Sequence, residues 1–583
     1  MHNATIAPPP AVSVDAAEHG RNGPKRSTWN RCRSHILPIL AVLVLGYLVL
    51  VPLVQLQVRA ASDGFSGYEV GFSGRGIGQT ILNTLFLGLG SLVIALTLGT
   101  ALAWWSTRLS SRFAWTATLP VLPIVIPPVA GIIGWAMMLS PTSGMINKLI
   151  RALPFYPEST GLPSGPINIF STTWIVILTG LSLTSFVFVF FRAGMARVNH
   201  ELLEAARSAG ASQTRTFIGI VLPLIRPSMI YGTAVALLLG LGQFTAPLLL
   251  GTQENIRVLT TEVYRFVSLP PVDYAAAAAV ASPLMFLGLA VVVIQKYLLT
   301  NEGRFVSDVG KGSRRVGRTS RVAPLAMLLY ALVALILPLF ALIVVSLSPF
   351  WSGSIDVATF TTANFQRIFE MPQTVNAIIT SLTVSVSAVA VSIPVGYLLA
   401  DILYRRRGSG AARAILDVLI TLPLGVPAVV FGAGFLFTYT QRPLVLYGTN
   451  AVIVIVYVAL MLPFTVRMQL AARISMGTSY EAAARVSGAG LIRAHIGIVI
   501  PMMRTAIGGA AALMFVMLSH EFAASLLVRS TQTQVMGTAF YDIWVNSSYP
   551  LVAAMGLLMC AVTAFGVLLA ARLGGGSKAL ESL

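Results

Sequence analysis

Charged residues are scarce in this chain of 583 amino acids: they make up 10% of it, while 56% of the residues are hydrophobic. Soluble domains carry about 25% charged residues. The sequence therefore has too few polar groups to cover the surface of a globule in water. That shortage excludes an ordinary soluble protein and makes a lipid bilayer the natural solvent.

Cysteine and catalytic motifs are also scarce. The two cysteines, Cys32 and Cys560, lie far apart without the spacing of a metal site, so both are predicted to be free thiols. No nucleophile–base constellation stands out, and Gly574-Gly-Gly-Ser-Lys578 does not match the G-x-x-x-x-G-K-[ST] phosphate loop. The sequence predicts no catalytic residue and no cofactor in this chain, and it leaves metal binding open.

Long apolar runs are what the chain does contain. A membrane-crossing helix needs about 20 mostly apolar residues. Twelve segments qualify: 36–58, 79–105, 113–140, 172–192, 228–250, 276–299, 323–348, 376–403, 413–440, 449–470, 505–528 and 549–572. The first is too long for the apolar part of a signal peptide. We expect an all-α integral membrane protein with about twelve transmembrane helices.

Lysine and arginine predict the orientation in the membrane. If the N-terminus is cytoplasmic, 30 of the 39 basic residues fall in cytoplasmic segments and nine in outer ones. Membrane proteins carry their excess of basic residues on the cytoplasmic side. We therefore expect a multi-pass protein of the plasma (inner) membrane with both termini in the cytoplasm. The same placement explains the net charge of +19 without a nucleic-acid partner.

The two halves of the chain are related in sequence. Leu122-Pro123-Ile-Val-Ile-Pro127 recurs 300 residues later as Leu422-Pro423-Leu-Gly-Val-Pro427. Six further residues recur at an offset of 278, namely Phe186, Arg207, Gly210, Pro223, Arg226 and Phe244, which correspond to Phe464, Arg485, Gly488, Pro501, Arg504 and Phe522. Corresponding spans have the same expected direction, so this is a parallel repeat enclosing a path between its halves.

The repeat predicts four regions. A polar basic cytoplasmic tail covers 1–35, a first transmembrane half covers 36–300, a basic cytoplasmic linker covers 301–322, and a second half covers 323–583. Within the proline-rich third and ninth spans, broken backbone hydrogen bonds are expected to kink the helices. Such kinks suit bending during gating, although membrane helices also tolerate static ones.

The longest cytoplasmic loops, 192–227 and 467–504, hold equivalent positions in the two halves. Each starts with Ala- and Glu-rich sequence that favours a short helix. A glycine then permits a sharp turn, a second amphipathic stretch follows, and a proline opens the next membrane helix. A helix–Gly–helix element of this kind suits docking into a partner, while a helix pair resting on lipid headgroups is the alternative. Its duplication favours two equivalent sockets on a partner.

These loops resemble the signature loop of binding-protein-dependent ABC importer permeases: Glu-Ala-Ala, three residues, Gly, nine residues, Ile, any residue, Leu-Pro. The second loop departs from that pattern, because Ala482 takes the glutamate position, Glu481 lies one residue earlier, and Ile500 replaces leucine. The resemblance implies that both loops contact an ATPase. The implied residues are Glu204, Ala205, Ala206, Arg207, Gly210, Ile220, Leu222 and Pro223 in the first loop, and Glu481, Ala482, Ala483, Arg485, Gly488, Ile498 and Pro501 in the second.

The same resemblance implies the partners and the cargo. Two copies of a cytoplasmic ABC ATPase would bind ATP and Mg, and an extracytoplasmic binding protein would deliver the solute. Fused double-loop permeases occur chiefly in the ferric-iron type, with thiamine, phosphonate and polyamine relatives. Val258–Tyr264, Glu521–Arg529 and Tyr541–Trp544 resemble the iron type. The resemblance therefore implies import of ferric iron or a related small solute.

A few polar residues lie within the predicted spans. Such groups are costly in a membrane and are functional candidates. His520 and Glu521 lie late in the eleventh span, toward the outer face, and Gln243 is the counterpart of Glu521 in the first half. These three residues are candidates for the translocation path, while a structural helix-end pair is the alternative for His520 and Glu521. Asp401 is expected to form an ion pair with the adjacent basic run Arg405–Arg407.

An ion-gradient-driven secondary transporter with twelve helices is the competing prediction. Its best-known class carries a G-x-x-x-D-R-x-G-R-R loop after the second span, whereas Ser106–Arg112 stands there in this chain. Paired docking loops also lack an explanation in that class. These two observations favour the importer permease.

Overall fold

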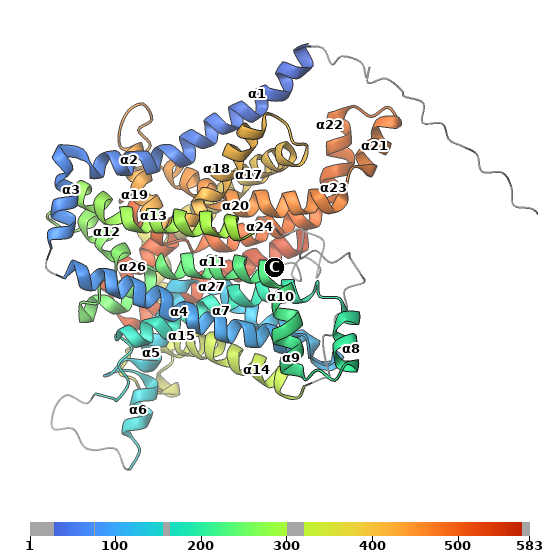
Figure 1. Ribbon diagram of the computed structural model, residues 1–583. Coiled ribbons are helices and arrows are strands. Elements are labelled where there is room, and N and C mark those ends of the chain that lie inside the picture. Colours follow the sequence, from blue (N-terminus) through green and yellow to red (C-terminus); the bar gives the residue numbers. More distant parts are fainter. Residues whose placement is uncertain (1–27, 75, 155–163, 300–319, 574–583) are drawn as a thin grey trace, which may run out of the picture.

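The structure, a computed structural model, describes residues 28–74, 76–154, 164–299 and 320–573 (Figure 1). Its secondary structure within these ranges is entirely helical. Most of the predicted tail 1–35, most of the linker 301–322 and the stretch 574–578 lie outside the described residues.

The first half is built from the following helical segments, in which η marks π or 3₁₀ turns: α1 (Thr28–Leu45), η1 (Gly46–Leu50), α2 (Val51–Ala60), α3 (Ser62–Ser73), α4 (Ile77–Ser106), η2 (Ser111–Val125), α5 (Pro128–Leu139), α6 (Met145–Arg151), α7 (Thr172–Met195), α8 (His200–Ser208), α9 (Gln213–Thr216), η3 (Phe217–Val221), α10 (Leu222–Leu224), α11 (Arg226–Leu241), η4 (Pro247–Gly251), η5 (Thr252–Glu254), α12 (Leu259–Ser268) and α13 (Tyr274–Leu298).

The second half repeats this order: α14 (Val322–Ala331), η7 (Leu332–Ile336), α15 (Leu337–Leu347), η8 (Val357–Thr359), α16 (Ala363–Glu370), α17 (Pro372–Tyr404), α18 (Gly410–Gly425), α19 (Ala428–Tyr439), α20 (Asn450–Met476), α21 (Ser479–Val486), α22 (Leu491–Ala494), η9 (His495–Val499), α23 (Ile500–Met502), α24 (Arg504–Ser519), α25 (Ala523–Val528), α26 (Met536–Asn546) and α27 (Tyr549–Leu573).

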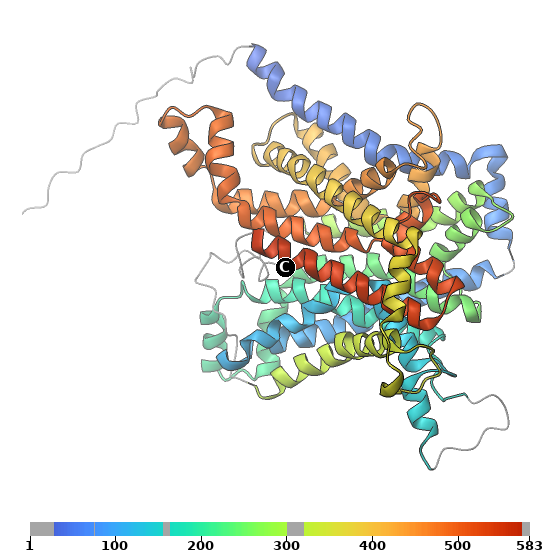
Figure 2. The same ribbon diagram turned by 180° about the vertical axis from the view of Figure 1, so that it is seen from behind.

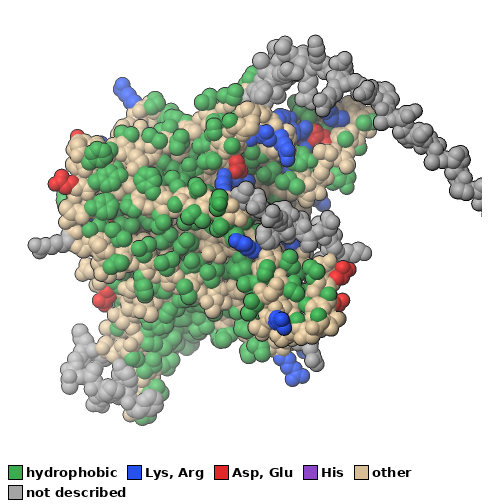
Figure 3. Space-filling view, viewed as in Figure 1, with side chains coloured by type: hydrophobic (Ala, Val, Ile, Leu, Met, Phe, Trp, Pro, Cys, Tyr) green, Lys and Arg blue, Asp and Glu red, His purple; other side chains and the backbone are tan. Residues whose placement is uncertain are grey.

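The predicted all-α membrane fold is confirmed. Among the described residues, eight helices are long and apolar enough to cross a bilayer, and four bent helix pairs bring the number of spans to as many as twelve. Their outer surface is apolar: Leu43, Val93 and Val293 are each more than 60% exposed. Hydrophobic side chains cover most of the face shown in Figure 3. Such a surface requires lipid as its solvent.

The third and ninth spans are broken rather than gently kinked. Segments η2 and α5 meet at an angle of 96°, and α18 and α19 meet at 112°. Pro127 and Pro427 lie at the two breaks in extended conformations. The helices of the fifth and eleventh spans, α11 and α24, end earlier than the sequence predicts, at Leu241 and Ser519. They are bent by 77° and 68° relative to the helical segments that precede them.

Four other prolines each lie two residues after the end of a π turn. Pro52, Pro223, Pro338 and Pro501 each follow a five-residue π segment, with one residue between. Proline cannot donate a backbone hydrogen bond, and its ring crowds the carbonyl four residues earlier. A widened turn at that place lets the helix continue.

The two halves hold each other by exchanging their first helices. α2 packs against α19 of the second half, and α15 packs against α5 of the first. Both crossings rely on a glycine: a Cβ at Gly134 would lie 2.5 Å from the Pro338 carbonyl oxygen, and one at Gly434 would lie 2.7 Å from that of Pro52. Small residues permit this close approach of membrane helices.

A further crossing, between α13 and α18, provides a stability test. A Cβ at Gly288 would come within 1.5 Å of the Gly425 carbonyl oxygen, whereas Gly78 in α4 has no atom within 4 Å of the equivalent position. Overpacking of this kind costs about 1–3 kcal/mol. Gly288→Ala should therefore lower the thermal unfolding temperature in detergent, and Gly78→Ala should not. Equal unfolding temperatures for the two variants would contradict the observed packing.

Candidate functional site

Two helix–Gly–helix elements stand at the same end of the molecule. The first loop element comprises α8 to α10 (residues 200–224), and the second comprises α21 to α23 (residues 479–502). Both views of the ribbon place them on one side, apart from each other and away from α12 and α26 (Figures 1 and 2). The two loops that are related in sequence therefore also occupy equivalent places at one end of the structure.

A left-handed glycine makes the turn in each element. Gly210 has φ +79° and Gly488 has φ +85°. Just beyond them, the Ala211 N–H donates to the Ala206 carbonyl at 3.0 Å, and the Ala489 N–H donates to that of Ala484 at the same distance. This is the glycine-dependent end of a helix, and it supplies the sharp turn that the sequence predicts.

The face that each element turns outward contains most of the predicted coupling residues. Two side chains are especially open, Val486 at 90% and Ile492 at 75% exposure. Glu481 is the exception, because it is buried. Arg207 lies in α8, and its side chain is outside the described part of the structure. The remaining predicted residues are either exposed (Glu204, Ala205, Gly210, Pro223, Ala482, Ala483, Arg485, Gly488 and Pro501) or half-buried (Ala206, Ile220, Leu222 and Ile498).

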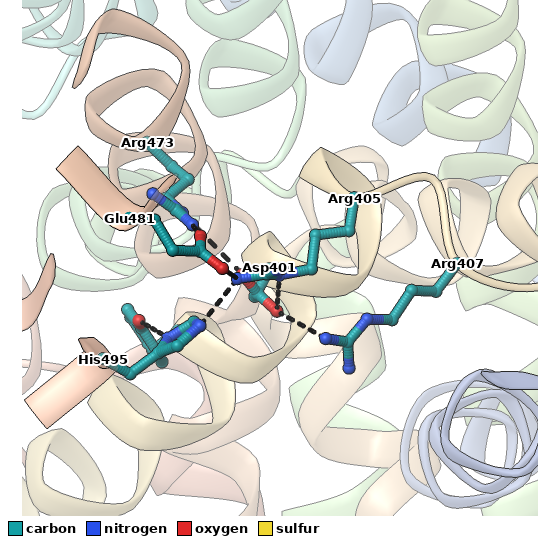
Figure 4. Close-up of polar contacts among 7 residues, drawn as sticks. Asp401, Arg405, Arg407, Arg473, Glu481 and His495 are labelled. Carbon is teal, nitrogen blue, oxygen red and sulfur yellow. Dashed lines mark hydrogen bonds and ion pairs between the residues drawn. The ribbon is translucent and has the colours of Figure 1, made fainter. Parts of the chain in front are cut away.

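Glu481 belongs to an ion cluster with Asp401, Arg405, Arg407, Arg473 and His495 (Figure 4). Its carboxylate accepts hydrogen bonds from Arg405, at 2.6 Å, and from Arg473. Burial by itself raises the pKa of Glu481, but the two guanidinium groups outweigh it and hold that pKa below its usual value. Asp401 accepts from Arg405 at 2.8 Å and lies 3.6 Å from Arg407. The predicted Asp401 ion pair is thereby confirmed.

The candidate path residues are bonded within their own halves. The Gln243 side-chain amide donates to Thr179 at 3.1 Å. The Glu521 carboxylate accepts from the backbone N–H groups of Ala524, at 2.7 Å, and Ser525, at 2.9 Å, and it also accepts from the Ser525 hydroxyl. Glu521 thus caps α25, in the manner of a structural helix-end residue.

His520 sits beside this cap. Its Nδ1 atom has no hydrogen-bond partner among the described residues. Within the same residues, no group of three His, Cys, Asp or Glu side chains is placed to hold a metal ion. Cys560 is a half-buried free thiol, and the side chain of Cys32 lies outside the description.

One of the contacts between the two halves is made by four aromatic rings. Phe244 and Phe522, which follow Gln243 and Glu521, have ring centroids 5.6 Å apart. Tyr264 and Tyr541 lie 6.2 Å apart edge to face. Each phenylalanine also touches the tyrosine of its own half, at 5.9 and 5.8 Å. The sequence repeat contained the phenylalanine pair, but the four-ring contact was missed because a sequence offset gives no side-chain direction.

The tyrosine-bearing helices α12 and α26 are fixed in the same way in both halves. The backbone N–H at the start of α12 donates to Thr84 of α4, at 2.9 Å, and that of α26 donates to Ser381 of α17, at 2.7 Å. The repeat therefore holds at the level of single hydrogen bonds. These hydrogen bonds make Ser381 the counterpart of Thr84, so α17 is related to α4 by an offset of 297 residues.

Two repeated helical halves, an aromatic contact between them and a pair of equivalent loop elements are features of a membrane-spanning transport subunit. Comparison with known proteins identifies the kind of transporter. The family described as "Binding-protein-dependent transport system inner membrane component" matches residues 91–301.

Relatives cover most of the chain. It is 29% identical over 469 residues to the probable ABC transporter permease protein y4fN of Sinorhizobium fredii, covering 77% of this chain and 79% of that protein. It is 23% identical over 535 residues to the ferric transport system permease protein FbpB of Actinobacillus pleuropneumoniae, covering 89% and 75%. A shorter match, 28% over 218 residues, covers 37% of this chain and 76% of the Escherichia coli spermidine/putrescine permease PotB.

Residues 91–301 thus match the permease family of binding-protein-dependent ABC importers, and relatives named as ABC and ferric transport permeases extend the similarity over most of the chain. These matches confirm the predicted family and the predicted transport function. None of them favours the ion-gradient-driven secondary transporter.

Substitution of Glu521 separates its two predicted roles. Glu521→Ala removes hydrogen bonds to a charged acceptor, so it should lower the free energy of unfolding by about 1.5–3 kcal/mol. Glu521→Gln keeps one acceptor oxygen and should cost less. Chemical unfolding in mild detergent measures both. An alanine variant as stable as the wild type but inactive in transport would assign the carboxylate to the solute path instead.

Proposed function

We propose that this chain forms the translocation path of an ATP-driven importer and that each loop element docks one of two ATPase copies. The observation that carries the proposal is the pair of helix–Gly–helix elements at one end of the molecule, each with an exposed, partly apolar outer face. Two equivalent elements call for two equivalent sockets, and a symmetric ATPase dimer offers them.

The proposed orientation puts this end in the cytoplasm. Many of the basic side chains visible in Figure 3 lie toward the loop elements, which agrees with the excess of basic residues expected on that side. Both termini are then cytoplasmic in the plasma (inner) membrane. ATP and Mg are bound by the ATPase partner, since the sequence has no recognisable phosphate loop.

The proposed constriction that closes the translocation path is the four-ring contact of Phe244, Tyr264, Phe522 and Tyr541. It joins the two halves, and α12 and α26, which carry the tyrosines, stand on the side away from the loop elements. When the ATPase dimer closes, the loop elements approach each other and the halves rock apart at these rings. An extracytoplasmic binding protein delivers the solute on that side.

Ferric iron or a related small solute is the proposed cargo. FbpB of A. pleuropneumoniae is named for ferric transport, and PotB is named for spermidine and putrescine. All three named solutes are cations. The Glu521 carboxylate and the hydroxyls of Tyr264 and Tyr541 are oxygen groups that suit a hard cation in transit.

Co-purification tests the partners. The tagged chain, isolated from native membranes in mild detergent, should bring down a Walker-type ATPase at two copies per chain, counted by native mass spectrometry. A co-purifying solute-binding protein would then lead to the cargo. Recovery of the chain without any ATPase after crosslinking would contradict the proposal.

The turn glycines provide a site-specific test. Gly210→Val and Gly488→Val force a β-branched residue into a left-handed conformation, at a cost of about 1–3 kcal/mol. Each variant should reduce ATPase association several-fold in a pull-down. Gly219→Ala and Gly497→Ala are the matched controls, because nothing lies within 4 Å of their Cβ positions and neither has a positive φ. Full association of both valine variants would exclude docking through these turns.

Uptake measurements test the cargo. Cells lacking the chain should accumulate less radioactive ferric iron than complemented cells, while spermidine uptake should stay equal. A defect in spermidine uptake alone would replace iron with a polyamine and leave the importer function intact.

A further inference from the structure

The two loop elements are attached to the membrane helices by contacts of opposite chemistry. The repeat aligns α4 with α17 at an offset of 297, because Thr84 and Ser381 bind equivalent backbone groups. It aligns the segments around the turn glycines at an offset of 278. These two offsets match four positions on four equivalent elements, namely Trp104 with Asp401, Met195 with Arg473, Leu203 with Glu481, and Phe217 with His495.

In the first half, all four positions are apolar. Leu203 of α8 is 1% exposed and belongs to one hydrophobic cluster with Met195 of α7, which is fully buried. Trp104 of α4 and Phe217 of η3 pack against that cluster, with ring centroids 4.4 Å apart. Arg108 lies over the Trp104 ring at 4.0 Å. Hydrophobic packing therefore holds α8 to the body of the protein.

In the second half, all four positions are polar or charged (Figure 4). Glu481 of α21 takes the place of Leu203 and is bonded to Arg473 of α20 and to Arg405, which follows α17. Arg473 is 1% exposed, and its Nε lies 3.7 Å from Asp401. Ionic contacts therefore hold α21 where apolar contacts hold α8.

His495 completes this cluster as a neutral acceptor. Arg405 donates to His495 Nε2 at 2.7 Å, and Nδ1 bonds to the Tyr397 hydroxyl. Because arginine has no lone pair to offer, Nε2 must be unprotonated. Arg405 thus joins α21, η9 and the end of α17 through three side chains, and it is the counterpart of Arg108 at the 297 offset.

We propose that Arg405 and Arg473 are positioning residues that hold α21 of the second loop element through Glu481. This ionic attachment replaces, position by position, the apolar attachment of α8 in the first loop element. Glu481 is then an internal anchor rather than a contact of the ATPase. Glu204, in contrast, lies on the exposed side of its helix. The consequence for the ATPase rests on the proposed function. The ATPase copy at the first loop element meets a glutamate, and the copy at the second meets the alanine and arginine surface of α21.

Hydrogen–deuterium exchange of the purified full-length chain tests the attachment without any ATPase. Glu481→Leu leaves three guanidinium groups, those of Arg405, Arg407 and Arg473, beside a single carboxylate, Asp401. Loss of one partner of a buried ion pair is costly, so exchange in residues 479–486 should rise by about a hundredfold. Exchange in residues 200–208 should not change. Leu203→Ala, the matched control, should accelerate exchange in 200–208 and leave 479–486 as in the wild type.

Removal of both partners distinguishes an ionic attachment from simple crowding. Arg473→Met with Glu481→Leu should exchange more slowly in 479–486 than Glu481→Leu alone, because the unpaired buried cation is gone. The fourfold variant Asp401→Trp, Arg473→Met, Glu481→Leu and His495→Phe transplants the apolar set of the first half, and Arg405 can then stack on the introduced tryptophan as Arg108 does on Trp104. It should restore slow exchange.

Two results would overturn the proposal. One is an unchanged exchange rate of 479–486 in Glu481→Leu. The other is a double variant that exchanges as fast as the single one or faster. Because the readout needs no partner, either result leaves the ATPase docking proposal untouched, and failure of docking leaves this test valid.

Discussion

Satisfaction of backbone hydrogen bonds without water is the constraint on which this structure depends. In a bilayer each unpaired N–H or C=O costs several kcal/mol, so spanning segments must be helices, and breaks are tolerated only inside the protein. The described chain follows that rule. Its right-angled breaks at Pro127 and Pro427 lie within spans that pack against the crossing helices of the other half. Four further prolines are absorbed by π turns rather than by breaks.

The same constraint explains how two halves with different side chains keep one geometry. Backbone angles at the turn glycines and the hydrogen bonds from α12 and α26 are repeated nearly atom for atom. Side chains are free to change as long as each buried polar group finds a partner. At the four equivalent positions near the loop elements, the first half has apolar side chains that need no polar partner, and the second half has side chains joined by ion pairs.

The sequence predicted the features that depend on composition and local pattern. Long apolar runs located the spans, and the glycines at 210 and 488 indicated the sharp turns. The predicted first span, 36–58, corresponds to the observed Ile36–Ala60, within a helix that begins at Thr28. Features that depend on which side chains meet were out of reach. The repeat paired Gln243 with Glu521, yet the rings that touch across the halves belong to the next residues, Phe244 and Phe522. Both pairs lie in non-helical links between helices, where no helical period indicates which side chain faces the other half.

The exchange of first helices and the ion cluster were equally invisible in the sequence. Nothing in the sequence distinguishes Gly134 and Gly434 from the other glycines among the 50 in the chain. The structure distinguishes them, because Pro338 and Pro52 of the opposite half pack directly against them. Asp401 was expected to pair with the basic run Arg405–Arg407 because that run lies beside it in the sequence. Glu481, Arg473 and His495 come from other elements, and only the fold brings them to the same place.

The central claim is that both loop elements engage the ATPase at once, and site-specific crosslinking tests it most directly. A chain with Cys32 and Cys560 replaced by serine would receive one new cysteine, at Ser208 of α8 or at Val486 of α21, both exposed. In membranes that contain the partner, both single-cysteine chains should crosslink to the ATPase, and a chain with both cysteines should capture two copies. Crosslinking from only one position, or from neither, would contradict the account.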